Sequence, residues 1–241
     1  MAELPAQSEA AQKWRPPAEA SLPEGFPQPT PPGEIRLKHY PSVRGAWVEV
    51  EGRLAGGLNA AFWPLFRHIQ RQGIAMTAPV VADYASEPAR SEAGRMEVAF
   101  LYPNRRLGRT SSDSTVAVRD SAPLLVVSIG VTGPYDLPTM RRALEGLELW
   151  LHENGGTWER AGSPRRLMYQ NPTWRNASRL YSEVEIPIVP VQRPQRSQPG
   201  RGLLVVGSGR SGVAGLFGDR ARPVGVLRRK EASIQEDPKN P

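Results

Sequence analysis

The feature that most limits the fold of this 241-residue chain is an internal repeat. The stretch KHYPSVRGAWVEVEG, residues 38–52, aligns without a gap on RDSAPLLVVSIGVTG, residues 119–133, and both are strand-like runs that end in glycine. A helical pattern follows each run, and two more strand-like segments follow each helical pattern. The sequence therefore predicts a strand–helix–strand–strand unit that occurs twice.

Both predicted helices carry apolar residues at spacings of four, three and four, a pattern that buries one face against a sheet. These residues are Leu58, Phe62, Leu65 and Ile69 in the first helix and Met140, Leu144, Leu147 and Leu151 in the second. Gly73 and Gly155 follow the helices in positions suited to left-handed C-caps. Because one helix covers only one face of a small sheet, we expect the units to join into a pseudo-symmetric α+β fold, a curved antiparallel sheet or barrel flanked by two helices.

Two prolines affect the predicted elements of the first unit. The segment IAMTAPV, residues 74–80, is expected to be the strand that follows Gly73, with Pro79 leaving one ladder position without a donor. Pro64 falls inside the first helical pattern, where a proline costs roughly 3 kcal/mol. The regular helix is therefore expected either to begin near Trp63 or to be kinked at Pro64.

Composition divides the chain into three parts. Residues 1–33 contain eight prolines and few large apolar side chains, so we expect a disordered Pro-rich arm. Residues 34–190 form the predicted domain, and residues 191–241 form a basic low-complexity tail. The net charges of these parts are −2, +3 and +6, which together give the +7 of the whole chain. Because most of the basic excess lies in the tail and no groove-reading motif accompanies it, we do not expect a nucleic-acid partner.

Several classes of function are excluded by what the sequence lacks. With no cysteine, the chain cannot form disulfides, thiolate nucleophiles or iron–sulfur sites. No signal peptide and no membrane-spanning stretch is recognised, which predicts a cytoplasmic protein. The pairs Glu49 with Glu51 and Glu183 with Glu185 could act as acid and base, but their alternation with apolar residues favours the solvated face of half-buried strands. Without a catalytic motif, the chain is not predicted to be an enzyme.

The motif GIAMTAPV after an aromatic-rich helix, with YPSVRGAWVEVEG before it and RLYSEVEIPI near the end, resembles the SOUL haem-binding protein family over about residues 34–188. The resemblance implies a fold shared with bacterial effector-binding domains. It also implies an exposed apolar groove for haem or another tetrapyrrole, along the first helix and the loop between the last two strands. The function implied is a haem or porphyrin carrier or buffer.

Carried onto this sequence, the resemblance places the groove at LNAAFWPLFRHIQ and NPTWRNASR. Trp63 points away from the sheet on a helical wheel, beside Phe62, and Trp174 in the loop is the second aromatic candidate. Arginines that could pair with propionate carboxylates are Arg67, Arg175 and Arg179. The alternative interpretation is that Trp63 covers a neighbouring loop and that the arginines are solvated.

Without cysteine, His39 and His68 are the candidate axial ligands to iron, with His152 and Met76 weaker candidates. Binding through the face of the ring, with no protein ligand to the metal, is the alternative. Two other functions remain open at this point. One is a sensor for a small amphipathic or cationic ligand that would use Glu49 or Glu185, and the other is an interaction scaffold that acts through its basic tail.

Overall fold

The structure is a computed structural model that describes residues 14–85, 93–112, 115–173 and 175–192. The first repeat comprises β1 (Ile35–Tyr40), β2 (Arg44–Arg53), α1 (Leu54–Arg71), β3 (Val80–Tyr84) and β4 (Ala93–Leu101). The second comprises β6 (Ala117–Asp120), β7 (Leu124–Thr132), α2 (Leu137–Glu153), β9 (Arg165–Met168) and β10 (Tyr181–Pro190). The short elements β5 (Ser111–Ser112), β8 (Trp158–Arg160) and the 3-10 helix η2 (Ala177–Arg179) lie between them.

The strands form one curved, open antiparallel sheet in the order β1-β7-β10-β9-β3-β4-β2-β6-β5, with β8 beside β10. From β1 to β6 this order is symmetric. If each strand is replaced by its counterpart in the other repeat, the same order results read backwards, with β9 and β3 at the centre. Each repeat gives its first strand to the other, because β1 pairs with β7 and β6 pairs with β2. The predicted duplication and the α+β class are confirmed.

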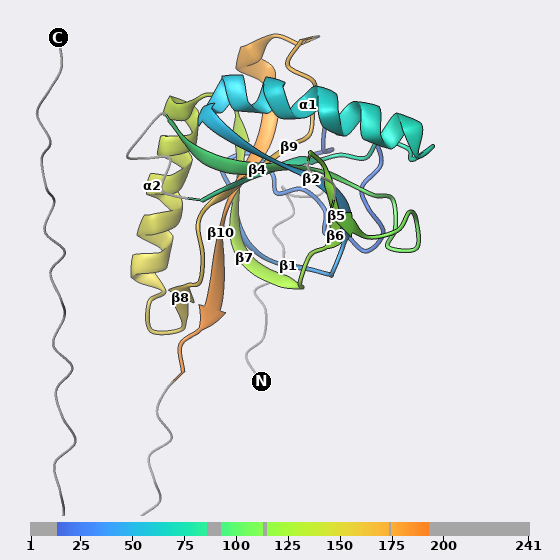
Figure 1. Ribbon diagram of the computed structural model, residues 1–241. Coiled ribbons are helices and arrows are strands. Elements are labelled where there is room, and N and C mark those ends of the chain that lie inside the picture. Colours follow the sequence, from blue (N-terminus) through green and yellow to red (C-terminus); the bar gives the residue numbers. More distant parts are fainter. Residues whose placement is uncertain (1–13, 86–92, 113–114, 174, 193–241) are drawn as a thin grey trace, which may run out of the picture. The chain divides into compact units, whose positions relative to one another are not determined.

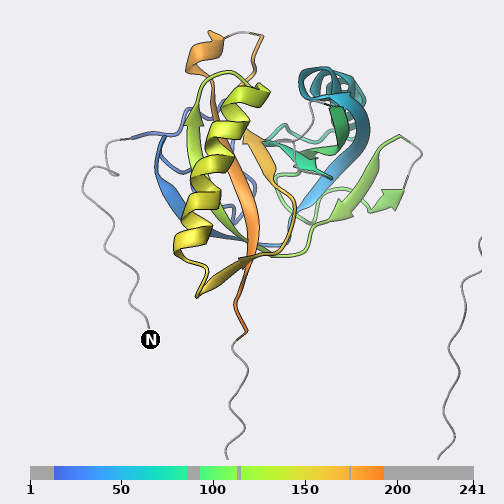
Figure 2. The same ribbon diagram turned by 90° about the vertical axis from the view of Figure 1, so that its left-hand side faces the viewer.

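Both helices lie on one face of this sheet, which we call the helix face (Figures 1 and 2). Helix α1 packs on β2 and β4, and α2 packs on β7, β8 and β10. Leu65 and Ile69 of α1 are buried, and so are Met140, Leu144 and Leu147 of α2. The apolar stripes predicted from spacing therefore form the main core.

The ends of the helices differ in part from the prediction. Helix α1 begins at Leu54 and continues through Pro64 to Arg71, so the predicted start near Trp63 is wrong. Gly73 has a φ of 62° and caps α1 as expected. The cap of α2 is Asn154 with a φ of −106°, and Gly155 does not take the left-handed conformation that we expected. Asn154 closes the helix instead through its side-chain amide, which donates to the Trp150 carbonyl at 2.8 Å.

The segment IAMTAPV is mostly not a strand, because β3 begins only at Val80, after the cis peptide bond between Ala78 and Pro79. Its polar groups are satisfied outside the sheet ladder. The Thr77 hydroxyl donates to the carbonyl of Leu101 at 2.7 Å, and the backbone N–H of Ala78 donates to the carbonyl of Ser21 at 3.0 Å. The predicted strand is therefore shortened to its last residue, Val80, and the N–H of Ala78 bonds to an N-terminal segment instead of to a neighbouring strand.

That N-terminal segment is residues 14–33, which we call the arm. Composition predicted disorder for residues 1–33, but the part that the structure describes crosses the sheet face opposite the helices. Its backbone hydrogen bonds reach four separate parts of the domain: Glu19 N to Tyr169 O, Ala78 N to Ser21 O, Glu24 N to Pro103 O, and Gly33 N to Gly130 O. Prolines lack an N–H but leave carbonyls and neighbouring N–H groups free for such bonds.

Side chains of the arm fill a second apolar core on this face. Phe26 is 7% exposed and packs on Tyr40 with ring centroids 4.6 Å apart. Trp14 packs on Tyr181 at 5.1 Å. The boundary expected at residue 34 therefore does not separate the arm from the domain core, because a few large side chains are enough to anchor an otherwise polar and proline-rich segment.

Candidate functional site

Three aromatic side chains follow one flank of α1, and we call them the aromatic surface. Phe62 and Phe66 are stacked with centroids 5.6 Å apart and an interplanar angle of 14°, and Phe62 also meets Phe100 of the sheet at 5.4 Å. Trp63 stands edge-on to both phenylalanines and is 58% exposed. Since Phe62 and Phe66 are fixed by the core, Trp63 rests on a rigid support and offers its indole to solvent.

The basic candidates do not all lie beside this surface. Arg67 follows Phe66 on α1 and is exposed. Trp174 lies outside the described residues. Arg175 is exposed and forms an ion pair with Glu19 of the arm at 3.0 Å, and Arg179 is an exposed residue of η2. The structure therefore ties Arg175 to the arm, and Arg67 is the candidate arginine that α1 itself carries.

The two histidine candidates are on different elements. His68 lies on the opposite flank of α1 from Trp63, and its Nε2 is 2.8 Å from the Tyr102 hydroxyl, with which it shares a hydrogen bond. His39 is exposed on β1, the first strand of the sheet order, whereas α1 packs on the sixth and seventh, β4 and β2. Neither imidazole belongs to the aromatic surface. No group of three or more candidate metal-ligating side chains is found within the described ranges.

The face opposite the helices buries two carboxylates that sequence reasoning assigned to solvent. Glu183 and Glu185 of β10 are both fully buried, so the prediction of a solvated face is wrong for this pair. Glu183 forms an ion pair with buried Lys38 of β1 and accepts hydrogen bonds from the Tyr169 hydroxyl at 2.5 Å and from the Thr30 N–H of the arm at 2.6 Å. The arm thus both covers this carboxylate and supplies one of its donors.

Glu185 is neutralised by a second set of partners. Its Oε2 is 3.1 Å from Nε of Arg165, an ion pair that lacks the alignment of a hydrogen bond, and its Oε1 accepts from the Tyr40 hydroxyl at 2.5 Å. Burial, together with the adjacent Glu185 carboxylate, raises the pKa of Tyr40 far above its usual value, so the phenol stays protonated and donates. Burial also raises the pKa of Glu185, and Arg165 opposes this effect.

These contacts decide what the glutamates can do. Each buried carboxylate has its own cation and a tyrosine donor, and neither faces solvent, so the pair is held as a structural network. Glu49 and Glu51 behave as predicted, since both are exposed and both pair with Arg95. Sequence reasoning missed Lys38 and Arg165. Alternation along the strand gave no signal for Lys38, because Leu37 is 40% exposed while Lys38 beside it is buried, the reverse of the usual pattern.

Comparison with known proteins begins with the family. A family model described as SOUL heme-binding protein matches residues 26–187, which includes residues 26–33 of the arm and nearly all of the sheet. A comparison with curated proteins returned no match. Within the described residues, neither helix is long and apolar enough to cross a membrane.

Several solved structures share the fold at low sequence identity. The EcmrR C-terminal domain is 15% identical with a TM-score of 0.55, and the match covers 66% of this chain and 98% of that one. EcmrR in a complex with DNA is 17% identical with a TM-score of 0.54, over 66% of this chain and 58% of the EcmrR chain. An uncharacterised conserved protein from Listeria innocua is 11% identical with a TM-score of 0.53, over 66% and 94%. At these identities the likeness shows that the chain shares the α+β fold of these structures.

Proposed function

Because this chain belongs to the SOUL heme-binding protein family, we propose that it binds haem or a related tetrapyrrole on the aromatic surface of α1. One observation carries the proposal: Trp63 is 58% exposed although it belongs to a packed cluster of three aromatic rings. A large exposed aromatic side chain on a rigid support marks a binding surface better than a scattered apolar residue does. The role that follows is that of a carrier or buffer.

The residues at this surface suit the chemical parts of the ligand. The ring faces of Trp63 and Phe66 offer apolar contact to a flat macrocycle, and the exposed guanidinium of Arg67 can pair with a propionate carboxylate through two hydrogen bonds. A bound haem would supply the iron centre. Arg179 and Trp174 are proposed as further contacts from the loop before β10, whereas Arg175 would first have to leave Glu19.

Iron ligation by histidine is not part of this proposal. The Nε2 of His68 already shares a hydrogen bond with Tyr102, and His39 lies on β1. Contact through the face of the macrocycle needs neither imidazole, so a metal-free porphyrin should bind about as tightly as haemin. A site built around an axial ligand would instead prefer haemin by orders of magnitude.

The test is a titration of the purified full chain with haemin and, separately, with protoporphyrin IX, followed by absorption and fluorescence. We expect saturation at one equivalent for both ligands and a loss of at least tenfold in affinity for Trp63→Ala. Arg67→Gln should lower the affinity for haemin severalfold. Leu149→Ala is the matched control, because Leu149 is 59% exposed on α2, away from the aromatic surface.

Two results would contradict the proposal. One is the absence of saturable binding up to tens of micromolar of either ligand. The other is an equal loss of affinity in Trp63→Ala and Leu149→Ala, which would mean that the porphyrin adsorbs to any exposed apolar residue. Equal unfolding midpoints of the three proteins would show that the comparison concerns binding rather than folding.

The other two functions receive less support. In the interior, Glu185 is already paired with Arg165, so a cationic ligand would have to displace a buried guanidinium, and Glu49 is exposed on β2 with Arg95 as its partner. Residues 193–241, which are nearly all of the basic tail predicted for residues 191–241, lie outside the described residues. A scaffold function of that tail remains a hypothesis, to be tested by truncation at Pro190.

A further inference from the structure

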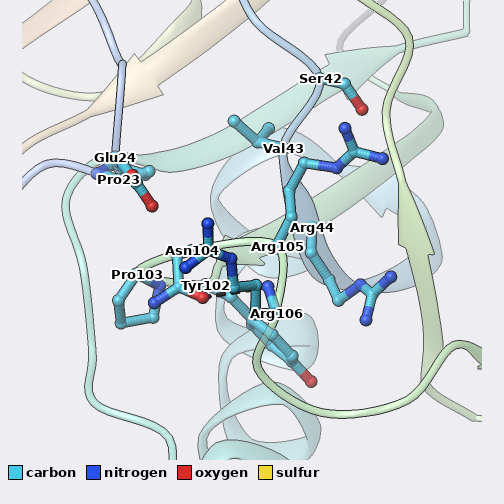
Figure 3. Close-up of a pocket in the computed structure, with 10 residues that line it drawn as sticks. All are labelled: Pro23, Glu24, Ser42, Val43, Arg44, Tyr102, Pro103, Asn104, Arg105 and Arg106. Carbon is cyan, nitrogen blue, oxygen red and sulfur yellow. Dashed lines mark hydrogen bonds between the residues drawn. The ribbon is translucent and has the colours of Figure 1, made fainter.

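A cavity of about 320 Å³ opens where three distant segments meet (Figure 3), and its lining includes none of the three side chains of the aromatic surface. The arm contributes Pro23 and Glu24 on one side. On the other side lie Ser42 and Val43 of the turn from β1 to β2 and Arg44, the first residue of β2. The segment after β4 completes the lining with Tyr102, Pro103, Asn104, Arg105 and Arg106. This volume is at the lower end of the range for small-molecule sites.

Arg44 is held rigidly at this cavity. Its Nε and Nη2 donate to the two oxygens of Asp120 at 2.8 and 3.0 Å, and its Nη1 donates to the Gly108 carbonyl at 2.9 Å. The hydrogen bond from Arg44 keeps the pKa of Asp120 below its usual value, so this carboxylate stays ionised at neutral pH. The fork-to-fork pair fixes one wall of the cavity.

The cavity carries more positive than negative charge. Arg105 also approaches Asp120, at 3.3 Å, so one carboxylate serves two guanidinium groups. The Arg106 guanidinium makes no hydrogen bond or ion pair with any other described residue, while its backbone N–H is fixed by the Asn104 side chain at 3.0 Å. Arg44, Arg105 and Arg106 against Asp120 and Glu24 leave a net charge of +1. The guanidinium groups of Arg105 and Arg106 keep N–H donors that no described residue accepts.

We propose that this cavity binds a small organic phosphate, whose phosphate group meets Arg105 and Arg106 and whose organic part lies against Pro23, Val43 and Pro103. A carboxylate carries only one charge and two oxygens, and in Asp120 both oxygens already accept from Arg44, with Arg105 sharing one of them. A phosphate monoester carries up to two charges and three free oxygens, so it suits two guanidinium groups from successive residues. The prolines and Val43 supply an apolar wall that inorganic phosphate would not use.

The arm gives this site a distinctive property. Glu24 lies in the lining and has the same sign as the ligand, while its backbone N–H holds the arm to Pro103 at 2.8 Å. Removing the negative charge without changing the size of the side chain, as in Glu24→Gln, should therefore tighten binding. A variant that strengthens binding is hard to explain by damage to the fold.

The experiment is isothermal titration calorimetry of the full chain with glycerol phosphate and, separately, with inorganic phosphate, at constant ionic strength. We expect a Kd below about 1 mM for glycerol phosphate and weaker binding of inorganic phosphate. Arg105→Gln and Arg106→Gln should each raise the Kd of glycerol phosphate at least tenfold, and Glu24→Gln should lower this Kd severalfold. Arg109→Gln is the matched control, since Arg109 is an exposed arginine of the same loop outside the lining and should change Kd less than twofold.

Three outcomes would overturn the proposal. These are no saturable binding of glycerol phosphate, a loss in Arg109→Gln as large as that in Arg106→Gln, or equal binding of the two phosphates. The second would reveal attraction by overall charge, and the third would remove the role of the apolar wall. The haemin titration of Arg106→Gln should match that of the unaltered protein, because the site does not depend on the aromatic surface of α1.

Discussion

Replacing Arg165 with methionine should reveal how much the buried carboxylate network depends on its cations. In the structure, Glu185 is fully buried, and among the described residues the Arg165 guanidinium is the charged group that pairs with its Oε2. Methionine keeps the aliphatic volume and removes the charge, which leaves the carboxylate buried with the Tyr40 hydroxyl as its remaining donor. Removing one partner of a buried ion pair costs about 3–5 kcal/mol, so we expect the free energy of unfolding to fall by that amount at pH 7.

The loss should depend on pH with a defined sign. Burial already raises the pKa of Glu185, and Arg165 opposes that shift, so the pKa rises further in Arg165→Met. The folded variant then binds a proton that the unfolded chain releases near pH 4.5, which favours folding at low pH. This advantage disappears as the pH rises through the raised pKa. The difference in stability from the unaltered protein should therefore be smaller at pH 4.5 than at pH 7.5.

Urea unfolding followed by circular dichroism at both pH values measures this effect. The control is Arg95→Met, which breaks an exposed pair with Glu49 and should cost no more than about 1 kcal/mol. The double variant Arg165→Met with Glu185→Gln should recover a large part of the loss, because it removes the unpaired charge. A double variant as unstable as the single one, or a loss independent of pH, would refute this account and assign the effect to packing.

Three further changes test the fold. Pro64→Ala should raise the free energy of unfolding by about 1–3 kcal/mol in urea titrations, because alanine restores the N–H that can donate to the Ala60 carbonyl within α1; no gain would mean that Pro64 packing offsets the missing bond. Gly130→Ala would place a Cβ atom 2.2 Å from the Thr30 carbonyl oxygen, so the arm should shift, with a loss of about 1–3 kcal/mol and faster proteolysis of the arm. An unchanged cleavage rate would argue against close contact there. Asp136→Ala should cost about 1 kcal/mol, because Asp136 accepts from the Thr139 N–H at 2.9 Å and caps α2. Partial burial acts to raise the pKa of Asp136, but hydrogen bonding to Thr139 outweighs it and keeps this pKa below its usual value. The difference in stability between Asp136→Ala and the unaltered protein should therefore shrink in unfolding experiments as the pH falls through that pKa. A difference in stability that stays constant with pH would exclude the charge effect.

Much of the fold follows from local sequence patterns. The spacing of Leu65 and Ile69 in α1 and of Met140 and Leu144 in α2 sets which helix face is buried, because a helix repeats every 3.6 residues whatever surrounds it. The duplicated order of elements and the motif that names the family are also readable from the chain, and so is the exposure of Trp63. Each of these depends only on residues close together in sequence.

The interior of the sheet depends on residues that are far apart in sequence. Alternation puts Glu183 and Glu185 on one face of β10 but cannot tell what covers that face. The cover is the arm, whose Thr30 N–H reaches Glu183 across 153 residues, and the cations come from β1 and β9. The sequence alone thus determined the repeat, the helix faces and the family. Only the tertiary structure decided that the arm covers the sheet face opposite the helices and buries its carboxylates. The free energy of burying a charge depends on partners that no local pattern specifies.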